Sequence, residues 1–239
     1  MKILKFGGTS VGSIESIRTL LKLVEEETSR GGFPVVVLSA MSGVTNLLLS
    51  MAESAVEGKG FSQQLEELES RHFEVVKALV EGHRQNPVLT KLKLLFNELE
   101  ELLQGVQSLS ELTLKTRDLI LSYGEVCSTF LVSYIAHQRI PEALCVEATE
   151  LIKTDSAFGN AKVDTDFTQR LIHNFFQVNP GKLCFITGFI ASDVNGRVTT
   201  LGRGGSDYTA AILGAALNAE EIQIWTDVDG MMTADPRIV

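Results

Sequence analysis

The sequence is poor in features of secreted or membrane-inserted proteins. Its 239 residues include only three cysteines, Cys127, Cys145 and Cys184, which are widely spaced among apolar neighbours. An odd, scattered set predicts reduced core thiols rather than a disulfide framework. The first residues lack the apolar run of a signal peptide, and no stretch approaches the roughly 18 apolar residues of a membrane span. We therefore predict a soluble cytoplasmic protein with no membrane partner.

Positive charge is also scarce. Lys and Arg total 21 against 30 Asp and Glu, which leaves a net charge of −9. This balance argues against nucleic acid or an anionic membrane as a partner. The histidines lack metal-ligand spacing, so surface or helix-packing roles are predicted for all four: His72, His83, His137 and His173. Any polyanionic ligand must be held by a few local cations and by backbone N–H groups.

Short apolar runs alternate with helical periods along the chain. Strands are predicted at 3–6, 35–39, 143–146, 183–187 and 222–226, with a weaker one at 161–163 and a hairpin at Asn195-Gly196. Helices are predicted at 14–24, from 47, around 167–176 and through 217, and residues 61–139 form a helical insertion whose leucine stripe we interpret as core. The predicted fold class is α/β, an open and mostly parallel sheet sandwiched by helices.

Residues 199–211 hold the densest set of functional features. They read as a strand end, a glycine-rich turn and the first turn of a helix, with Ser206 as the predicted N-cap. The glycines let backbone N–H groups approach a ligand, and a helix N-terminus favours an anion. Arg203 can grip a carboxylate or phosphate with two parallel hydrogen bonds, and Asp207 adds the opposite charge. A tight turn with a surface ion pair is the alternative, but the combination favours a site for a zwitterion or phosphates.

A second glycine-rich turn follows the first strand. Lys5 precedes Gly7-Gly8, and it could reach phosphates cradled by the N–H groups of residues 7–10. The order of residues matches neither a P-loop nor a dinucleotide fingerprint, and a solvated lysine beside a tight turn fits equally well. The stronger argument is convergence: the loops at 5–10, 39–45, 188–189, 202–207 and 226–230 all follow strands. Parallel strands would bring many of these loops to one sheet edge, where ligands bind.

Several motifs together resemble one known family. They are residues 5–12 (KFGGTSVG), 39–46 (SAMSGVTN), 123–125 (YGE), 201–207 (LGRGGSD), 225–230 (WTDVDG) and 235–237 (DPR). In this order they are similar to the aspartate kinases of the amino-acid-kinase fold, over essentially the whole chain. The WTDVDG motif near the end of the chain looks most like the kinase half of bifunctional aspartokinase–homoserine dehydrogenases, with monofunctional members left open.

The resemblance implies a specific reaction. The γ-phosphoryl group of ATP, with Mg²⁺ bridging ATP oxygens, would pass to the β-carboxylate of L-aspartate and give 4-phospho-L-aspartate, the first step of lysine, threonine and methionine biosynthesis. A free aspartate side chain titrates near 3.9, so the nucleophile is already ionised at pH 7 and needs no general base. The task is to bring an anion to a polyanion by positioning and charge neutralisation.

The resemblance also implies residue roles. Lys5 and Asp207 would be catalytic, Asp207 by orienting either Lys5 or the substrate amine. Arg203 would hold the α-carboxylate of aspartate and Glu125 its α-ammonium group. The implied substrate-binding set is Ser39, Thr45, Glu125, Phe189, Arg203, Ser206 and Asp207. The implied ATP-binding set is Lys5, Gly7, Gly8, Thr9, Ser10, Thr226, Asp227, Met232, Asp235 and Arg237.

Some points depart from the family or stay open. Met232 stands where an aromatic residue often stacks near the nucleotide, and no direct protein ligand to the metal is predicted. The Asp227/Asp229 pair has metal-ligand spacing, although loop capping by Asp229 fits equally well. We expect residues 1–239 to form one amino-acid-kinase catalytic domain cut short at its C-terminal end. The rest of the nucleotide lobe and the regulatory ACT domains would be missing, turnover would be slow, and the full-length enzyme would be a homo-oligomer.

Two alternatives remain at this stage. The chain could be a sister kinase acting on glutamate, acetylglutamate or a nucleotide monophosphate, against which the helical insertion and the Tyr123-Gly124-Glu125 triplet argue. It could also be a non-catalytic amino-acid-binding or assembly module. The joint presence of Lys5, Glu125, Arg203 and Asp207 argues against a decayed site.

Overall fold

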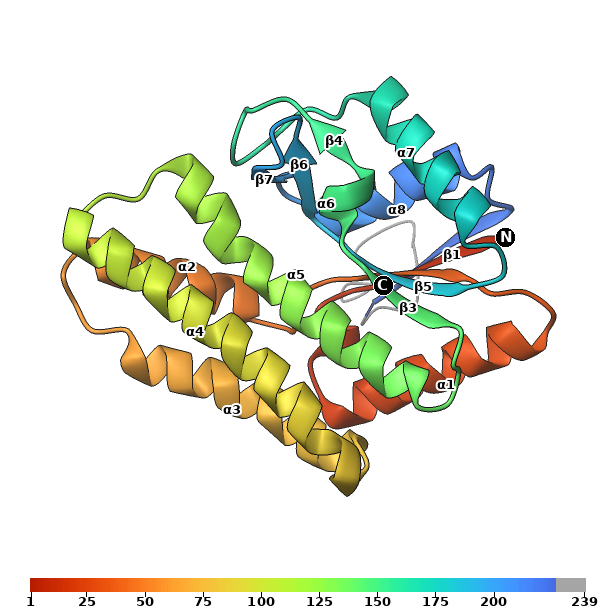
Figure 1. The fold of residues 1–239 in the computed structure, drawn as a ribbon, viewed down its shortest axis with the longest axis horizontal. Coiled ribbons are helices and arrows are strands. Elements are labelled where there is room, and N and C mark those ends of the chain that lie inside the picture. Colours follow the sequence, from red (N-terminus) through yellow and green to blue (C-terminus); the bar gives the residue numbers. More distant parts are fainter. Residues whose placement is uncertain (227–239) are drawn as a thin grey trace, which may run out of the picture.

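A five-stranded parallel sheet forms the centre of the computed structural model, which describes residues 1–226 (Figure 1). The strand order is β3-β5-β2-β1-β8. The strands are β1 (Lys2–Phe6), β2 (Val35–Leu38), β3 (Ala143–Val146), β5 (Leu183–Thr187) and β8 (Glu221–Trp225). All four pairings are parallel, so the loops that follow these strands leave from one edge. The predicted fold class is confirmed.

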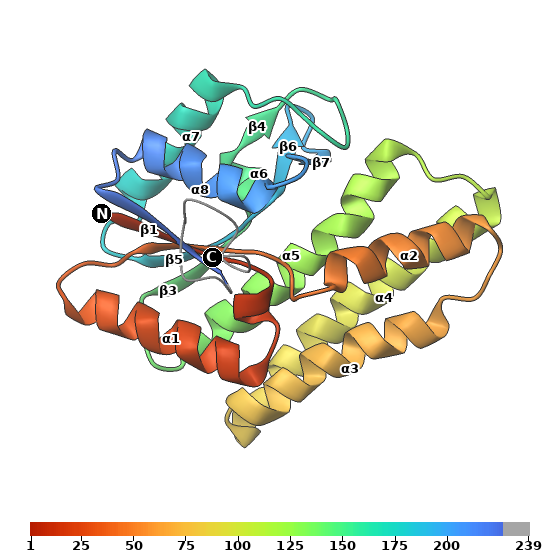
Figure 2. The same ribbon diagram turned by 180° about the vertical axis from the view of Figure 1, so that it is seen from behind.

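Side chains alternate between two cores on the two faces of this sheet. On β1, Leu4 and Phe6 join the larger core, whereas Ile3 faces the smaller one. The larger core is covered by α1 (Ile14–Ser29) and α5 (Leu114–His137), and the smaller one by α7 (Thr165–Val178) and α8 (Gly205–Ala216), as the reverse view shows (Figure 2). Complete burial of a side chain such as Phe6 stabilises the fold by roughly 1.5–3 kcal/mol.

The predicted helical insertion forms a bundle beside the sheet (Figure 1). Its helices are α2 (Val44–Val56), α3 (Ser62–Leu79), α4 (Gln85–Leu109) and α5, with short 3-10 turns at η1 (Thr9–Val11) and η2 (Gly82–Arg84). Leu92, Leu99 and Leu103 are completely buried, which confirms that the leucine stripe is core. The bundle also includes α2, which lies ahead of the expected start at residue 61.

Helix α5 is the most apolar long element of the described chain. An 18-residue stretch of this 24-residue helix has a mean hydropathy of 1.5, so by length and composition it could cross a membrane, contrary to the sequence expectation. However, 72% of that stretch is buried inside the protein, so α5 is a core helix between the sheet and the bundle. It also buries the polar side chains of Asp118, Glu125 and Ser128.

A small second sheet lies beside the first. It consists of β4 (Lys153–Thr154), β6 (Ile190–Asp193) and β7 (Val198–Thr200), and α6 (Ala148–Leu151) precedes it. β6 and β7 form the hairpin predicted at Asn195-Gly196, held by Asp193, which accepts hydrogen bonds from the Asn195 and Arg197 N–H groups. The Arg197 guanidinium keeps the pKa of Asp193 well below its usual range. β4 and α6 were not predicted because two and four residues are too short to show a period.

The isolated cysteines and histidines differ in their surroundings. All three cysteines are free, but only Cys127 and Cys184 are buried. Cys145 is exposed on the edge strand β3, so its prediction as a core residue was wrong: an edge strand leaves part of its surface uncovered. His72 packs edge-on against Phe96 inside the bundle, and burial lowers its pKa to about 4, which confirms its helix-packing role.

Candidate active site

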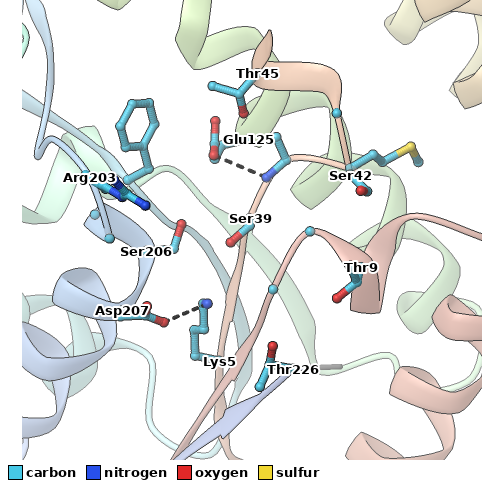
Figure 3. Close-up of a pocket in the computed structure, with 18 of the residues that line it drawn as sticks. Lys5, Thr9, Ser39, Ser42, Thr45, Glu125, Arg203, Ser206, Asp207 and Thr226 are labelled. Carbon is cyan, nitrogen blue, oxygen red and sulfur yellow. Dashed lines mark hydrogen bonds and ion pairs between the residues drawn. The ribbon is translucent and has the colours of Figure 1, made fainter. Parts of the chain in front are cut away.

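One cavity of about 510 Å³ opens at the edge of the central sheet where the strands end (Figure 3). A volume of this order suits a small-molecule ligand. The predicted site residues that line it are Lys5, Gly7, Gly8, Thr9, Ser39, Thr45, Glu125, Phe189, Arg203, Ser206, Asp207 and Thr226. They come from segments far apart in sequence, most of them strand-end loops that the parallel topology brings together.

A few site residues differ from the sequence prediction. The cavity is also lined by residues that were not singled out: Ala40, Met41, Ser42, Gly43, Gly202, Gly204 and Gly205. All of them lie within loops that had been recognised as strand-end loops, so their position was the available signal. Ser10 does not line the cavity, and its hydroxyl donates instead to the Trp225 carbonyl at 3.4 Å. Asp227, Asp229, Met232, Asp235 and Arg237 lie outside the described residues.

Lys5 is a buried cation at the centre of the sheet edge. Its partners in register are Val37 on β2 and Ile224 on β8, and the residue is only 8% exposed. Nζ lies 2.6 Å from Oδ1 of Asp207, which sits in the first turn of α8. Of the two roles left open for Asp207, this geometry corresponds to the orientation of Lys5.

The loop after β1 offers fewer free donors than the sequence suggested. The Gly7 N–H donates to the Trp225 carbonyl at 3.1 Å, and the Ser10 N–H donates to the Gly7 carbonyl at 3.0 Å. These two groups therefore cannot cradle a phosphate as predicted. Within residues 1–226, the N–H groups of Gly8 and Thr9 have no such backbone partner, so they are the donors that this loop can offer.

Two helices begin at the cavity. Helix α8 is capped by Gly204 rather than by Ser206, and α2 is capped by Gly43. Both glycines have φ near +75°, a conformation that other residues adopt with strain. Ser206 is not the cap because α8 already begins at Gly205. Ser206 and Thr45 are the second residues of their helices, where backbone N–H groups lack intrahelical acceptors. Together the two N-termini favour an anion in the cavity.

Glu125 brings an uncompensated carboxyl group to the cavity wall. Glu125 is 3% exposed, and its Oε1 accepts a hydrogen bond from the Ala40 N–H at 3.2 Å. Oε2 is buried and has no partner among the described residues. Burial raises the pKa of Glu125 to about 8, against the lowering effect of the Ala40 N–H. An unsatisfied buried carboxyl of this kind is suited to receive a cationic ligand group.

Arg203 and Glu125 lie at one end of the cavity, while Lys5, Asp207 and Thr226 lie at the other (Figure 3). Arg203 is exposed on the glycine-rich loop. The first end therefore presents a guanidinium for a carboxylate, and a buried carboxyl that a cationic ammonium group would ionise on binding, as an amino acid requires. The second end combines a cation with the start of α8, as a phosphate requires.

Phe189 has strained backbone at the cavity wall. Its φ of +65° is rare for a residue with a side chain, and it is held by two hydrogen bonds. The Phe189 N–H donates to Thr209 Oγ1 at 3.1 Å, and its carbonyl accepts from the Leu201 N–H at 2.9 Å. Such a conformation costs about 1–3 kcal/mol and is typical of functional sites.

Comparison with known proteins agrees with this geometry. The sequence model of the amino acid kinase family matches residues 1–239. Lysine-sensitive aspartokinase 3 of Escherichia coli is 37% identical in an alignment 242 positions long, gaps included, that covers 98% of this chain and 51% of that protein. The bifunctional aspartokinase/homoserine dehydrogenase of Buchnera aphidicola is 31% identical in an alignment of 243 positions that covers 100% of this chain and 30% of that protein.

A solved structure supports the same relationship. The crystal structure of E. coli aspartokinase III in complex with aspartate and ADP matches with a TM-score of 0.90 and 32% identity, over 100% of this chain and 52% of that chain. The chain thus spans about half the length, or less, of the curated relatives it matches.

Proposed function

The chain belongs to the amino acid kinase family, and from that premise we propose that it is the catalytic part of an aspartokinase. It would transfer the γ-phosphoryl group of ATP to the β-carboxylate of L-aspartate. The observation that carries this proposal is the two-ended cavity, with Glu125 and Arg203 at one end and the Lys5–Asp207 pair at the other. The aspartokinases among the relatives, one of them solved with aspartate and ADP, support it.

The amino-acid end has the groups that aspartate needs. Its α-ammonium group would meet the free Oε2 of Glu125, which would then be ionised, and its α-carboxylate would pair with the Arg203 guanidinium. The hydroxyl groups of Ser39 and Thr45 would hydrogen-bond the substrate from the opposite loop. These contacts would direct the β-carboxylate toward the end that holds Lys5.

Phosphoryl transfer then needs no general base. An oxygen of the ionised β-carboxylate attacks the γ-phosphorus, and the bond to the bridging oxygen of ADP breaks. Lys5, the N–H groups of Gly8 and Thr9 and the N-terminus of α8 would neutralise the phosphoryl oxygens. Asp207 would hold the Lys5 ammonium in place.

Magnesium fits this cavity as a partner of the nucleotide. Among residues 1–226 there is no cluster of three or more His, Cys, Asp or Glu that could bind a metal ion. Mg²⁺ commonly takes most of its ligands from phosphates and water. We therefore propose that it enters with ATP, whose β- and γ-phosphate charge it would neutralise.

The remaining proposals concern the whole protein. Residues 1–239 would act as one catalytic domain whose longer relatives carry further sequence, and homo-oligomerisation stays a prediction. A cytoplasmic location also stays a prediction, and one relative, aspartokinase 1 of Arabidopsis thaliana, is described as chloroplastic.

Calorimetric titration of L-aspartate in the presence of Mg²⁺ and a non-hydrolysable ATP analogue tests the proposed function. We expect saturable binding that Arg203→Ala abolishes, with L-glutamate giving no heat. Exposed Arg18 on α1 supplies the matched control, because Arg18→Ala removes the same charge away from the cavity. Binding of L-glutamate in place of L-aspartate would point to a sister kinase, and binding of neither would contradict the proposal.

A further inference from the structure

Asp118 is buried in α5 outside the cavity wall, yet it holds the base of the glycine-rich loop that lines the site, together with a neighbouring loop around Gly159 that does not line it. We propose that Asp118 is a positioning residue: it fixes the glycine-rich loop that carries Arg203 at a set distance from Glu125, and thereby sets the affinity for the amino acid. This inference rests on the proposed function, because it takes Glu125 and Arg203 as the two groups that grip the substrate.

The hydrogen bonds of Asp118 carry the argument. The residue is 1% exposed. Its Oδ2 accepts from the Gly159 N–H at 2.8 Å and the Thr200 N–H at 3.0 Å, and its Oδ1 accepts from the Thr200 hydroxyl at 2.8 Å. A buried carboxylate held by three donors fixes those donors firmly, because charge-assisted hydrogen bonds are roughly twice as strong as neutral ones.

Thr200 lies at the base of the glycine-rich loop that carries Arg203. It is the last residue of β7 and lies three positions before Arg203. Its carbonyl accepts from the Ala161 N–H at 2.9 Å, so the loop around Gly159 and the end of β7 are tied to each other as well as to Asp118. Loss of the carboxylate would leave the buried Thr200 N–H and the half-buried Gly159 N–H without this acceptor, and the base of the loop would have to move to satisfy them.

Helix α5 holds Asp118 at a fixed spacing from Glu125. Asp118 and Glu125 lie seven residues apart, close to two helical turns, so they share one face and are separated by about 10 Å along the axis. Glu125 contacts the loop after β2 through Ala40, and Asp118 contacts the end of β7. One buried, rigid helix therefore carries both the proposed ammonium-binding group and the anchor of the carboxylate-binding loop. A displacement of about 1 Å at such a site can lower the reaction rate about a hundredfold.

Two substitutions of Asp118 separate the effect of its hydrogen bonds from the effect of its negative charge. Asp118→Ala removes every acceptor, and we expect it to weaken L-aspartate binding by about 10- to 100-fold in calorimetry, with binding of the ATP analogue changed less than about threefold. Asp118→Asn can keep all three bonds: its amide oxygen accepts from both N–H groups, and its NH2 donates to the Thr200 hydroxyl. It should therefore retain aspartate affinity within about threefold of the wild type.

Asp193 supplies a matched control. Asp193 is as buried as Asp118, at 1% exposure, and belongs to the same small sheet as Thr200. It accepts hydrogen bonds from backbone and side-chain donors of the hairpin at 193–197. Asp193→Ala should lower stability while leaving aspartate affinity within about threefold. Amide hydrogen exchange at Gly159 and Thr200 should accelerate in Asp118→Ala but not in Asp118→Asn.

The outcomes distinguish failure of the proposed function from failure of the positioning role of Asp118. If wild-type protein does not bind L-aspartate, the proposed function and this inference both fail. If wild type binds and Asp118→Ala binds equally well, or loses aspartate and nucleotide in equal proportion, only the positioning role is overturned. Equal loss in Asp193→Ala would overturn it too. Should Asp118→Ala not fold, Thr200→Val removes one of the three bonds, and an aspartate affinity unchanged from wild type would refute the inference.

Discussion

Replacing Glu125 by glutamine should raise the stability of the protein relative to the wild type progressively as the pH rises from about 5 to about 8. The carboxyl is 3% exposed and receives one hydrogen bond, so burial raises its pKa to about 8 from the ordinary 4.5. The folded chain therefore holds this proton at pH values where the unfolded chain has released it. Between those two values, unfolding releases a proton, and the free energy of unfolding falls as the pH rises.

The expected size follows from the pKa. Each pH unit between the unfolded and folded pKa values changes the free energy of unfolding by about 1.4 kcal/mol. The contribution of Glu125 should thus fall by about 4 kcal/mol between pH 5 and pH 8 and then level off. Glutamine has no proton to release, and its amide oxygen can keep the bond from the Ala40 N–H. Its buried NH2 group adds an offset that does not depend on pH, so the slope is the quantity to measure.

Urea unfolding of both proteins at pH 5, 6, 7, 8 and 9 measures that slope. The advantage of Glu125→Gln over the wild type should grow by several kcal/mol up to pH 8. Glu66→Gln, an exposed change on α3, is the control and should show no such trend. A stability difference between wild type and Glu125→Gln that stays constant from pH 5 to pH 9 would refute the reasoning. The same variant should lose L-aspartate binding, because it cannot offer a negative charge to the ammonium group.

Three further predictions follow from the cavity. Because Glu125 is mostly protonated at pH 7, L-aspartate binding should release close to one proton. Calorimetry in two buffers of different ionisation enthalpy measures the number of protons released. A heat of binding that does not depend on the buffer would contradict the prediction. Lys5→Met should weaken binding of the ATP analogue at least about tenfold while L-aspartate binding changes less than threefold, since one charged hydrogen bond contributes about 1.5–3 kcal/mol. Gly124→Ala should lower the free energy of unfolding, measured by urea denaturation, by about 1–3 kcal/mol, because its Cβ would meet the Ala40 Cβ at 2.8 Å. A gain in stability would mean that helix propensity outweighs packing.

The glycine-rich stretch at 199–211 shows which structural features local sequence patterns can predict. The strand end, the turn and the start of a helix were all predicted, because glycine and periodic apolar residues act through their immediate neighbours. The choice of cap was wrong: Ser206 is a good cap by type, but Gly204 takes the left-handed conformation that begins α8. Backbone geometry at a turn depends on where the next strand and helix must go.

The loop after β1 shows a different limit. Its glycines indicated a ring of N–H donors, yet those of Gly7 and Ser10 are occupied, and Gly7 bonds to Trp225 more than 200 residues further along the chain. Nothing near Gly7 in the sequence reveals that partner. The roles of Glu125 and Arg203 came from the resemblance to a family, whereas Asp118 carried no signal in the sequence at all.

By itself the sequence determined the α/β class, the buried parallel strands, the helical insertion and the small-residue loops after the strands. Each of these depends on side-chain periodicity and turn chemistry within a few residues. The tertiary structure alone decided that Lys5 meets Asp207, that one oxygen of Glu125 has no partner within residues 1–226, and that Asp118 holds Thr200, 82 residues away. Those are contacts between distant segments, set by packing of the whole core rather than by any local pattern.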